Sequence, residues 1–154
     1  MSEVDRIEKF WQQCREAIAG LPADAPEAWA FGATPAHADE LLALVLDGTK
    51  TATASSLWDH EHTGEPIPEV GWLNIILDGR GHPRALLQTV AVTVVPFDQV
   101  SEAHASAEGE GDRTLATWRD IHERYWRNHS ESPRGFAPTL PVVCEELRLL
   151  FSVA

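Results

Sequence analysis

The sequence predicts a single α+β domain, in which helices surround an antiparallel, barrel-like sheet. Its 154 residues are a usual length for one domain, and 44% of them are hydrophobic, which is enough to form a core. Segments 72–77 and 85–95 are rich in aliphatic and β-branched residues, and a glycine-rich turn separates them. Consecutive strands joined by a short turn favour antiparallel pairing. We therefore expect residues 1–154 to form one domain, to which residues 1–30 contribute a helix and a connector.

The first half of the chain carries two helical patterns. Apolar residues recur at helical spacing over residues 3–19, and Gly20 and Pro22 end this pattern. We expect this N-terminal helix to pack on the sheet. Thr34 followed by Pro35 has the form of a helix N-terminus, and the apolar stripe after it ends at Gly48.

The second half adds two further helices and a strand. Asp98 is a candidate cap for a short helix over residues 99–107, and Thr114 is a candidate cap for a longer one. The longer helix has an apolar face, on which we expect His122 to be a packed core histidine. Residues 140–153 form the last predicted strand.

Composition excludes several classes of function. The formal net charge of -12 opposes broad electrostatic binding of a polyanion, so we expect no DNA partner. The two cysteines lack the spacing of a metal or disulfide motif, and the chain has no phosphate-binding loop. We expect no leader, no membrane segment and a cytoplasmic location. The histidine-rich stretch 59–62 is typical of a surface loop, so neither a metal nor a cofactor is predicted.

Two polar segments are the candidates for a functional site. In residues 48–53, Lys50 lies among hydroxyl side chains directly after the second predicted helix. The second segment, residues 108–112, is a glycine-spaced acidic loop. The alternative interpretation is structural: the first segment would be a helix stop followed by an edge strand, and the second a solvated acidic turn.

The order and spacing of several segments resemble the larger bacterial members of the ASCH family. The similarity covers nearly the whole chain, including Phe10-Trp11 near the start. It is carried by LVLDGTKTATAS (44–55), PIPEVGW (66–72), LDGRGHPRA (77–85), EGEGDRTLATWRDIH (108–122) and the terminal VVCEELRLLF. The resemblance implies a PUA-like antiparallel β-barrel that binds RNA or a nucleoside. Some small members of the family are amidohydrolases that deacylate N4-acetylcytidine, and others have been proposed as RNA-binding modules or ribonucleases.

The resemblance also assigns candidate catalytic residues. The K-x-x-T pattern of the amidohydrolases matches Lys50 and Thr53, and their glutamate matches Glu108 when the His-Ala pair of that pattern is aligned with residues 104–105. Glu110 lies two residues further along the same loop. The chain departs from the family pattern at Trp72, where an acidic residue is common.

Amide hydrolysis needs a nucleophile, a proton acceptor and a proton donor to the leaving nitrogen. Thr53 is the candidate nucleophile. We expect Lys50, desolvated and neutral or sharing a proton, to activate it as the base. The alternative is that Lys50 is paired with Glu108 and stabilises the oxyanion, while Glu108 handles the proton. We expect Glu108 to be buried within hydrogen-bonding reach of Lys50, and Glu110 to be peripheral. Because strand side chains alternate, Lys50 and Thr53 can face one site only if residues 50–53 contain a bulge or a helical turn.

Further residues are predicted to bind the substrate. Aromatic faces in loops or at element ends can stack on a base, and Trp29, Phe31 and Trp72 are in such positions. Thr51 and Glu110 add polar groups. The predicted ligand is a small nucleoside, with RNA as the second candidate partner.

Overall fold

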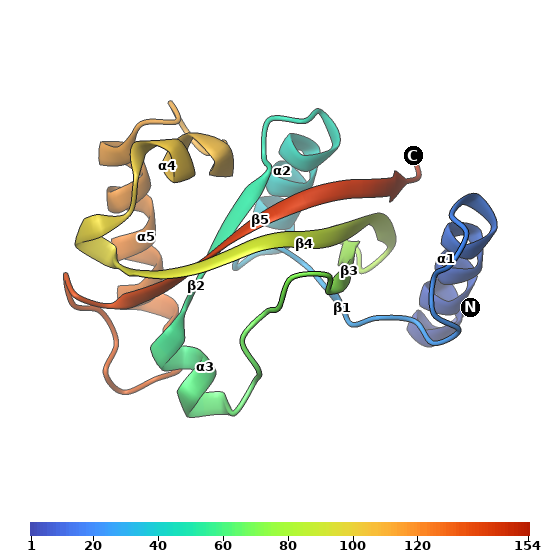
Figure 1. Cartoon of the computed structure of the whole chain (residues 1–154), viewed down its shortest axis with the longest axis horizontal. Coiled ribbons are helices and arrows are strands. Elements are labelled where there is room, and N and C mark those ends of the chain that lie inside the picture. Colours follow the sequence, from blue (N-terminus) through green and yellow to red (C-terminus); the bar gives the residue numbers. More distant parts are fainter.

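The structure, a computed structural model, describes all residues from Met1 to Ala154 and contains one mixed sheet with helices around it (Figure 1). The α-helices are α1 (Glu3–Ala17), α2 (Pro35–Leu46), α3 (Leu57–Thr63), α4 (Glu102–Glu108) and α5 (Leu115–His129), and a 3-10 turn covers Phe97–Gln99. The strands are β1 (Ala28–Trp29), β2 (Ala52–Ser56), β3 (Leu73–Leu77), β4 (Pro83–Pro96) and β5 (Pro141–Ser152). No helix is long and apolar enough to span a membrane.

The sheet has the order β1-β3-β4-β5-β2. The predicted hairpin of β3 and β4 is present, and β5 pairs antiparallel with both β4 and β2. Two details add to the predicted antiparallel, barrel-like arrangement: the short β1 pairs parallel with β3, and β1 and β2 remain as edges that hydrogen bonds do not close. A strand of two residues at 28–29 and its partner at 73–77 are too far apart in sequence for local patterns to reveal their pairing.

Most helix starts follow the predicted capping chemistry. The side chains of Thr34 and Thr114 accept hydrogen bonds from backbone N–H groups three residues ahead, as expected at N-caps. Asp98 does not cap α4, because residues 97–99 form the 3-10 turn and Ser101 takes the capping position. The predicted surface loop at 59–62 is instead part of α3, which Ser56 caps and Gly64 ends in the left-handed conformation.

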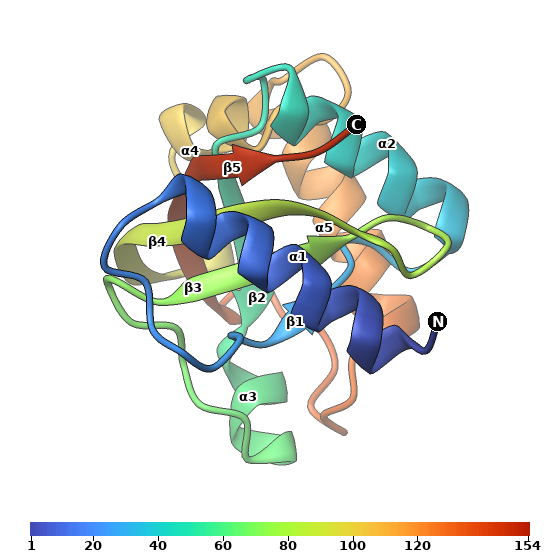
Figure 2. The same cartoon turned by 90° about the vertical axis from the view of Figure 1, so that its right-hand side faces the viewer.

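Three apolar clusters hold these elements together. Helix α1 crosses the sheet at one end (Figures 1 and 2), where Phe10, Trp11 and Cys14 contact Ile75 and Leu86. Helix α2 packs on β3, β4 and β5 through a second cluster. Helices α4 and α5 cover the opposite end of the sheet with a third cluster that contains Phe97, Trp118 and Trp126. The candidate site lies where the second and third clusters approach each other.

Candidate functional site

A cavity of about 210 Å³ borders both edges of the sheet. Trp29 of β1 and Thr53 of β2 both line it, although their strands are at opposite ends of the sheet order. The sheet therefore bends far enough for its two edges to face one space, which is the barrel-like feature that the sequence predicted. The other lining residues are Ala30, Phe31, Gly32, His37, Leu41, Lys50, Ala54, Glu108, Glu110, Ile121, His122, Tyr125 and Trp126.

Lys50 and Thr53 reach the same cavity because Lys50 precedes the regular strand. The backbone N–H groups of Thr49 and Lys50 both donate to Leu44 O at the end of α2, and β2 begins only at Ala52. Side-chain alternation therefore does not apply to Lys50. The predicted irregularity at residues 50–53 is the chain segment that joins this helix end to the strand.

The amine of Lys50 is buried and faces oxygen atoms. Its side chain is 1% exposed, and Nζ donates to Ala52 O at 2.9 Å and to Glu108 O at 3.3 Å. Carboxylate oxygens of Glu108 and Glu110 lie 3.7 Å and 3.9 Å from Nζ. The ring of Phe31 covers another side, with its centroid 5.3 Å from Nζ. Such surroundings stabilise a charged ammonium group.

Glu108 lies at the end of α4, and Gly109 turns the chain there in the left-handed conformation with φ +76°. A Cβ at Gly109 would come within 3.0 Å of the backbone oxygen of Thr49. Glycine at this position therefore allows the acidic loop to approach the Lys50 segment closely. The contact is extended by the N–H group of Thr51, which donates to Ala107 O at 2.7 Å.

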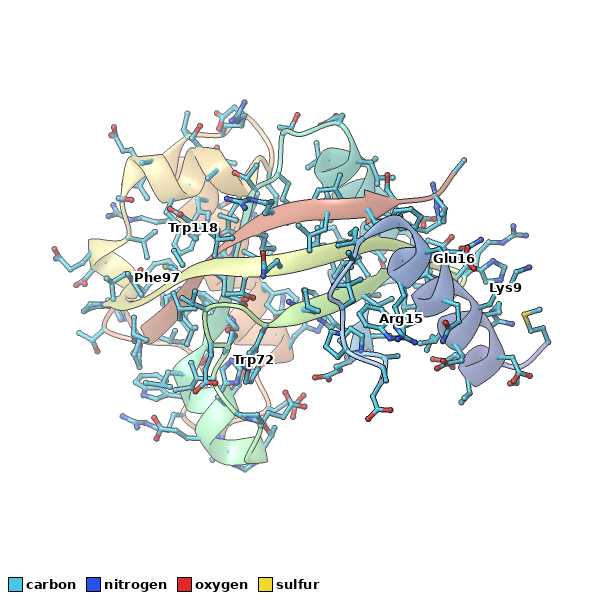
Figure 3. The ribbon with its side chains drawn as sticks, turned by 45° about the vertical axis from the view of Figure 1, so that its right-hand side comes forward. Lys9, Arg15, Glu16, Trp72, Phe97 and Trp118 are labelled. Atoms are coloured by element: carbon cyan, nitrogen blue, oxygen red, sulfur yellow. The ribbon has the colours of Figure 1, made fainter.

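Three side chains donate hydrogen bonds to the buried carboxylate of Glu108. His104 contacts Oε2 at 2.7 Å, His122 contacts Oε1 at 3.2 Å, and the indole N–H of Trp118 donates to Oε2. The rings of Trp118 and His122 stack with centroids 4.2 Å apart. Figure 3 shows Trp118 near the α4 and α5 end of the molecule.

Electrostatics holds Glu108 as a carboxylate. Burial alone would raise the pKa of Glu108, but His122, His104 and Lys50 outweigh it and hold the pKa well below its usual range. Burial would lower the pKa of His122, but the charge of Glu108 reverses this effect and raises it. The two groups therefore favour a charged pair.

Glu110 is a second carboxylate of the same cavity, so its predicted peripheral position is wrong. Its side chain is 12% exposed and lies 3.9 Å from Lys50 and from His37. Glu108 is the more buried of the two, as predicted, although its carboxylate contacts Lys50 at ion-pair distance. The left-handed glycines 109 and 111 turn the loop so that both carboxylates face Lys50.

Two predicted substrate-binding residues lie outside the cavity. Thr51 is exposed, and its backbone rather than its side chain is used, since Thr51 O accepts from Leu147 N. Trp72 donates its indole N–H to Glu69 and does not line the cavity. Trp29 and Phe31, in contrast, line the cavity with their rings in edge contact at 4.8 Å.

Sequence reasoning missed the roles of His104, Trp118 and His122 around Glu108. His122 was expected to be only a core residue; it is buried, but it also lines the cavity and contacts Glu108. The spacing of Trp118 and His122, one helical turn apart, correctly indicated a shared face. The spacing of residues within α5 does not reveal that this face of the helix packs against the end of α4.

Glu108, Glu110 and His122 also have a geometry that could hold a metal ion, since their ligand atoms lie within 4.8 Å of one another. However, the Lys50 amine lies within 4 Å of both carboxylates. The lysine and the histidine already balance the two negative charges, so the cluster does not require a cation.

Comparison with known proteins identifies the family. A family model described as the ASCH domain matches residues 27–150. The crystal structure of protein EF3133 from Enterococcus faecalis has a TM-score of 0.86 and 34% identity, covering 95% of this chain and 88% of that chain. An ASCH domain from Lactobacillus crispatus also has a TM-score of 0.86, with 25% identity over 95% of this chain and 94% of that chain.

A hypothetical protein with 13% identity and a TM-score of 0.54, covering 80% of this chain and 98% of that chain, shares the fold alone. No curated protein gives a match. The two closer similarities confirm the predicted α+β, PUA-like fold. Together with the family match over most of its length, they show that the chain belongs to the ASCH domain family.

Proposed function

We propose that the protein is an amidohydrolase that removes the acyl group from N4-acylated cytosine nucleosides such as N4-acetylcytidine. The observation that supports this most directly is that Lys50, Thr53 and Glu108 line one cavity. Two of them lie near residue 50 and the third is about sixty positions later, so no local pattern requires them to meet. An amine, a hydroxyl and a carboxylate in one partly enclosed space are the groups that acyl transfer uses.

The dimensions and lining of the site support a small substrate. The inner cavity of about 210 Å³ adjoins a second one of about 400 Å³, and both are lined by His37 and Glu110. Small-molecule pockets usually measure roughly 300–1,000 Å³. A base against Trp29 and Phe31 in the inner cavity, with its sugar in the outer one, matches these volumes. The formal net charge of -12 disfavours a long RNA chain as substrate.

Lys50 fits the role of oxyanion stabiliser better than that of a neutral base. Its amine is within 4 Å of two carboxylates, and both of its hydrogen bonds are donated to backbone oxygens, so it serves as a donor in this site. In this arrangement the Thr53 hydroxyl attacks the acyl carbon, and the ammonium group stabilises the negative charge that develops on the acyl oxygen. Glu108 holds Lys50 and His122 in position.

The test is turnover of N4-acetylcytidine by the purified protein, with cytidine measured by chromatography. We expect product formation, and a loss of about 10²–10⁴-fold in Lys50→Met and Thr53→Val, the range typical of positioned catalytic groups. The matched control is Thr51→Val, because Thr51 is exposed and outside the cavity. Circular dichroism verifies that each variant is folded.

The double variant sharpens the test. If Lys50 and Thr53 act as one unit, the combined loss will be close to the larger single loss rather than to the product of both. No turnover by folded wild-type protein at high concentration rules out this proposal. Salt-sensitive binding of structured RNA without product then favours an RNA-binding module, and chain cleavage favours a ribonuclease.

A further inference from the structure

Each strand of the sheet contributes one polar side chain to a continuous row on a single face. The row is Trp29 of β1, Asn74 of β3, Thr89 of β4, Glu145 of β5 and Thr53 of β2, in the order of the strands. Trp29 and Thr53, its two ends, line the inner cavity. We refer to these five residues as the polar row.

Hydrogen bonds along the polar row run in one direction and end on a carboxylate. The Trp29 indole donates to Asn74 Oδ1 at 3.1 Å, and Asn74 Nδ2 donates to Thr89 Oγ1 at 3.4 Å. Thr89 Oγ1 then donates to Glu145 Oε2 at 3.0 Å. Each hydrogen bond therefore orients the side chain that donates the next one. The last bond orients the carboxyl group of Glu145 through Oε2, so Oε1 can accept a further hydrogen bond.

Glu145 and Thr53 are direct cross-strand neighbours in the antiparallel pair of β5 and β2. Side chains at such positions point to the same face, with Cβ atoms about 4.5–5.5 Å apart. Glu145 is 7% exposed and does not line the cavity itself, so its side chain is buried beside that of Thr53, which does line it. A glutamate side chain is long enough to span this separation, and catalytic hydrogen bonds are commonly completed only when substrate binds.

The proposed reaction requires an acceptor for the Thr53 proton, and the other groups of the cavity are poorly suited to it. Lys50 Nζ faces two carboxylates and donates both of its hydrogen bonds, and Glu108 already accepts three side-chain hydrogen bonds. Burial raises the pKa of Glu145, while Thr89 and His60 of α3 partly offset the effect. A carboxylate with a raised pKa is a stronger base than one with a lowered pKa.

We propose that Glu145 is the general base that accepts the proton of the Thr53 hydroxyl, a role that rests on the proposed acyl transfer. As Thr53 Oγ1 bonds to the acyl carbon, its proton moves to Glu145 Oε1. The bond from the acyl carbon to the leaving nitrogen then breaks, and that nitrogen takes the proton from Glu145. Water attacks the acyl-threonine, gives a proton to Glu145, and releases the carboxylic acid as Thr53 recovers its proton.

The experiment measures acylation of Thr53 by p-nitrophenyl acetate, a general acyl donor that requires no nucleoside. Peptide mass spectrometry locates the acetyl group, and release of p-nitrophenol gives the rate. We expect an adduct on Thr53 in the wild type and a rate lower by about 100-fold in Glu145→Gln. The matched control is Glu146→Gln, because Glu146 is exposed and points to the opposite face; its rate should equal that of the wild type.

The pH profile separates a base from a structural group. A base must be ionised, so the wild-type rate should fall as the pH decreases through the raised pKa of Glu145, whereas Glu145→Gln should lack this limb. His60 is the titratable group that acts on Glu145 from α3, and His60→Gln should shift the limb without removing it.

Three results contradict the assignment of Glu145: no adduct on Thr53 in the wild type, an equal rate in Glu145→Gln, or an unchanged pH limb in that variant. These results differ from those expected if only the proposed nucleoside substrate is wrong. A protein that acylates Thr53 with dependence on Glu145, but leaves N4-acetylcytidine intact, has the inferred base and a different acyl substrate.

Discussion

Two buried glutamates lie close to the same cavity, Glu108 in its lining and Glu145 beside Thr53 in the sheet, and their pKa values are shifted in opposite directions. Glu108 lies at the helical end, in contact with α5, and Glu145 lies within the sheet. They are 1% and 7% exposed, respectively, so both have lost most of their contact with water. Nevertheless, the pKa of Glu108 is lowered and the pKa of Glu145 is raised.

The difference between the two glutamates is the number of donors around each. Glu108 accepts hydrogen bonds from His104, His122 and Trp118 and lies near Lys50, whereas Glu145 accepts one from Thr89. Burial penalises both carboxylates, and only Glu108 has enough positive charge and donors to reverse the penalty. Glu108 is therefore suited to hold other groups in place, and Glu145 is suited to exchange a proton.

The largest expected effect is on stability, in Glu108→Gln. Loss of the negative charge leaves the Lys50 ammonium and His122 without their main buried partner, and breaking a buried pair costs about 3–5 kcal/mol. Urea denaturation at neutral pH measures this loss. Glu110→Gln is the control, because Glu110 is more exposed and its closest ion-pair contacts, to Lys50 and His37, are both at 3.9 Å. Equal losses in both variants would show that Glu108 has no special role.

The pH dependence of stability sharpens the same contrast. The folded-state pKa of Glu108 is lowered, so its stabilisation is present above its unfolded pKa of about 4.3 and is lost as the pH falls through the folded value. The folded-state pKa of His122 is raised, so its contribution is complete below about pH 6.5 and is lost as the pH rises through the folded value. Urea midpoints of the wild type and Glu108→Gln should therefore converge in acid; parallel curves would contradict this pairing.

Removal of one donor tests the difference at a smaller scale. His104→Leu deletes the 2.7 Å hydrogen bond to Glu108, and hydrogen bonds to charged groups contribute about 1.5–3 kcal/mol. We expect a loss of about 2 kcal/mol in urea denaturation and an acid-unfolding midpoint that moves to higher pH. His62→Leu is a surface control from α3. A midpoint that does not move would indicate that the other donors alone hold Glu108 ionised.

The smallest expected effect on stability has the opposite sign. Glu145→Gln removes a poorly compensated buried charge and keeps an acceptor for Thr89, so stability at neutral pH should rise by zero to about 1 kcal/mol. Thermal and urea denaturation measure the change, with Glu146→Gln as the exposed neighbour for comparison. A loss of stability similar to that of Glu108→Gln would mean that both carboxylates stabilise the fold, which would contradict the difference between them.

Elements with local signals can be predicted from the sequence alone. Thr34, Thr114 and the 78–81 turn specify two helix starts and the β3–β4 hairpin through contacts within a few residues, and these predictions are confirmed. Residues 59–62 form a helix rather than the predicted surface loop, because Ser56 caps the start of this segment and Gly64 ends it. The family resemblance, confirmed by the comparisons, provided Lys50, Thr53 and Glu108 as candidates.

The packing of distant segments determines which of these residues are in contact and whether each carboxyl group is ionised. Pairing of Thr53 with Glu145 joins positions that are distant in sequence, and the packing of α4 on α5 brings His122 to Glu108. The fold also leaves Thr51 and Trp72 outside the cavity. Sequence patterns report which face of an element is apolar, but the pKa of a buried carboxyl depends on the donors that other elements bring within hydrogen-bond distance.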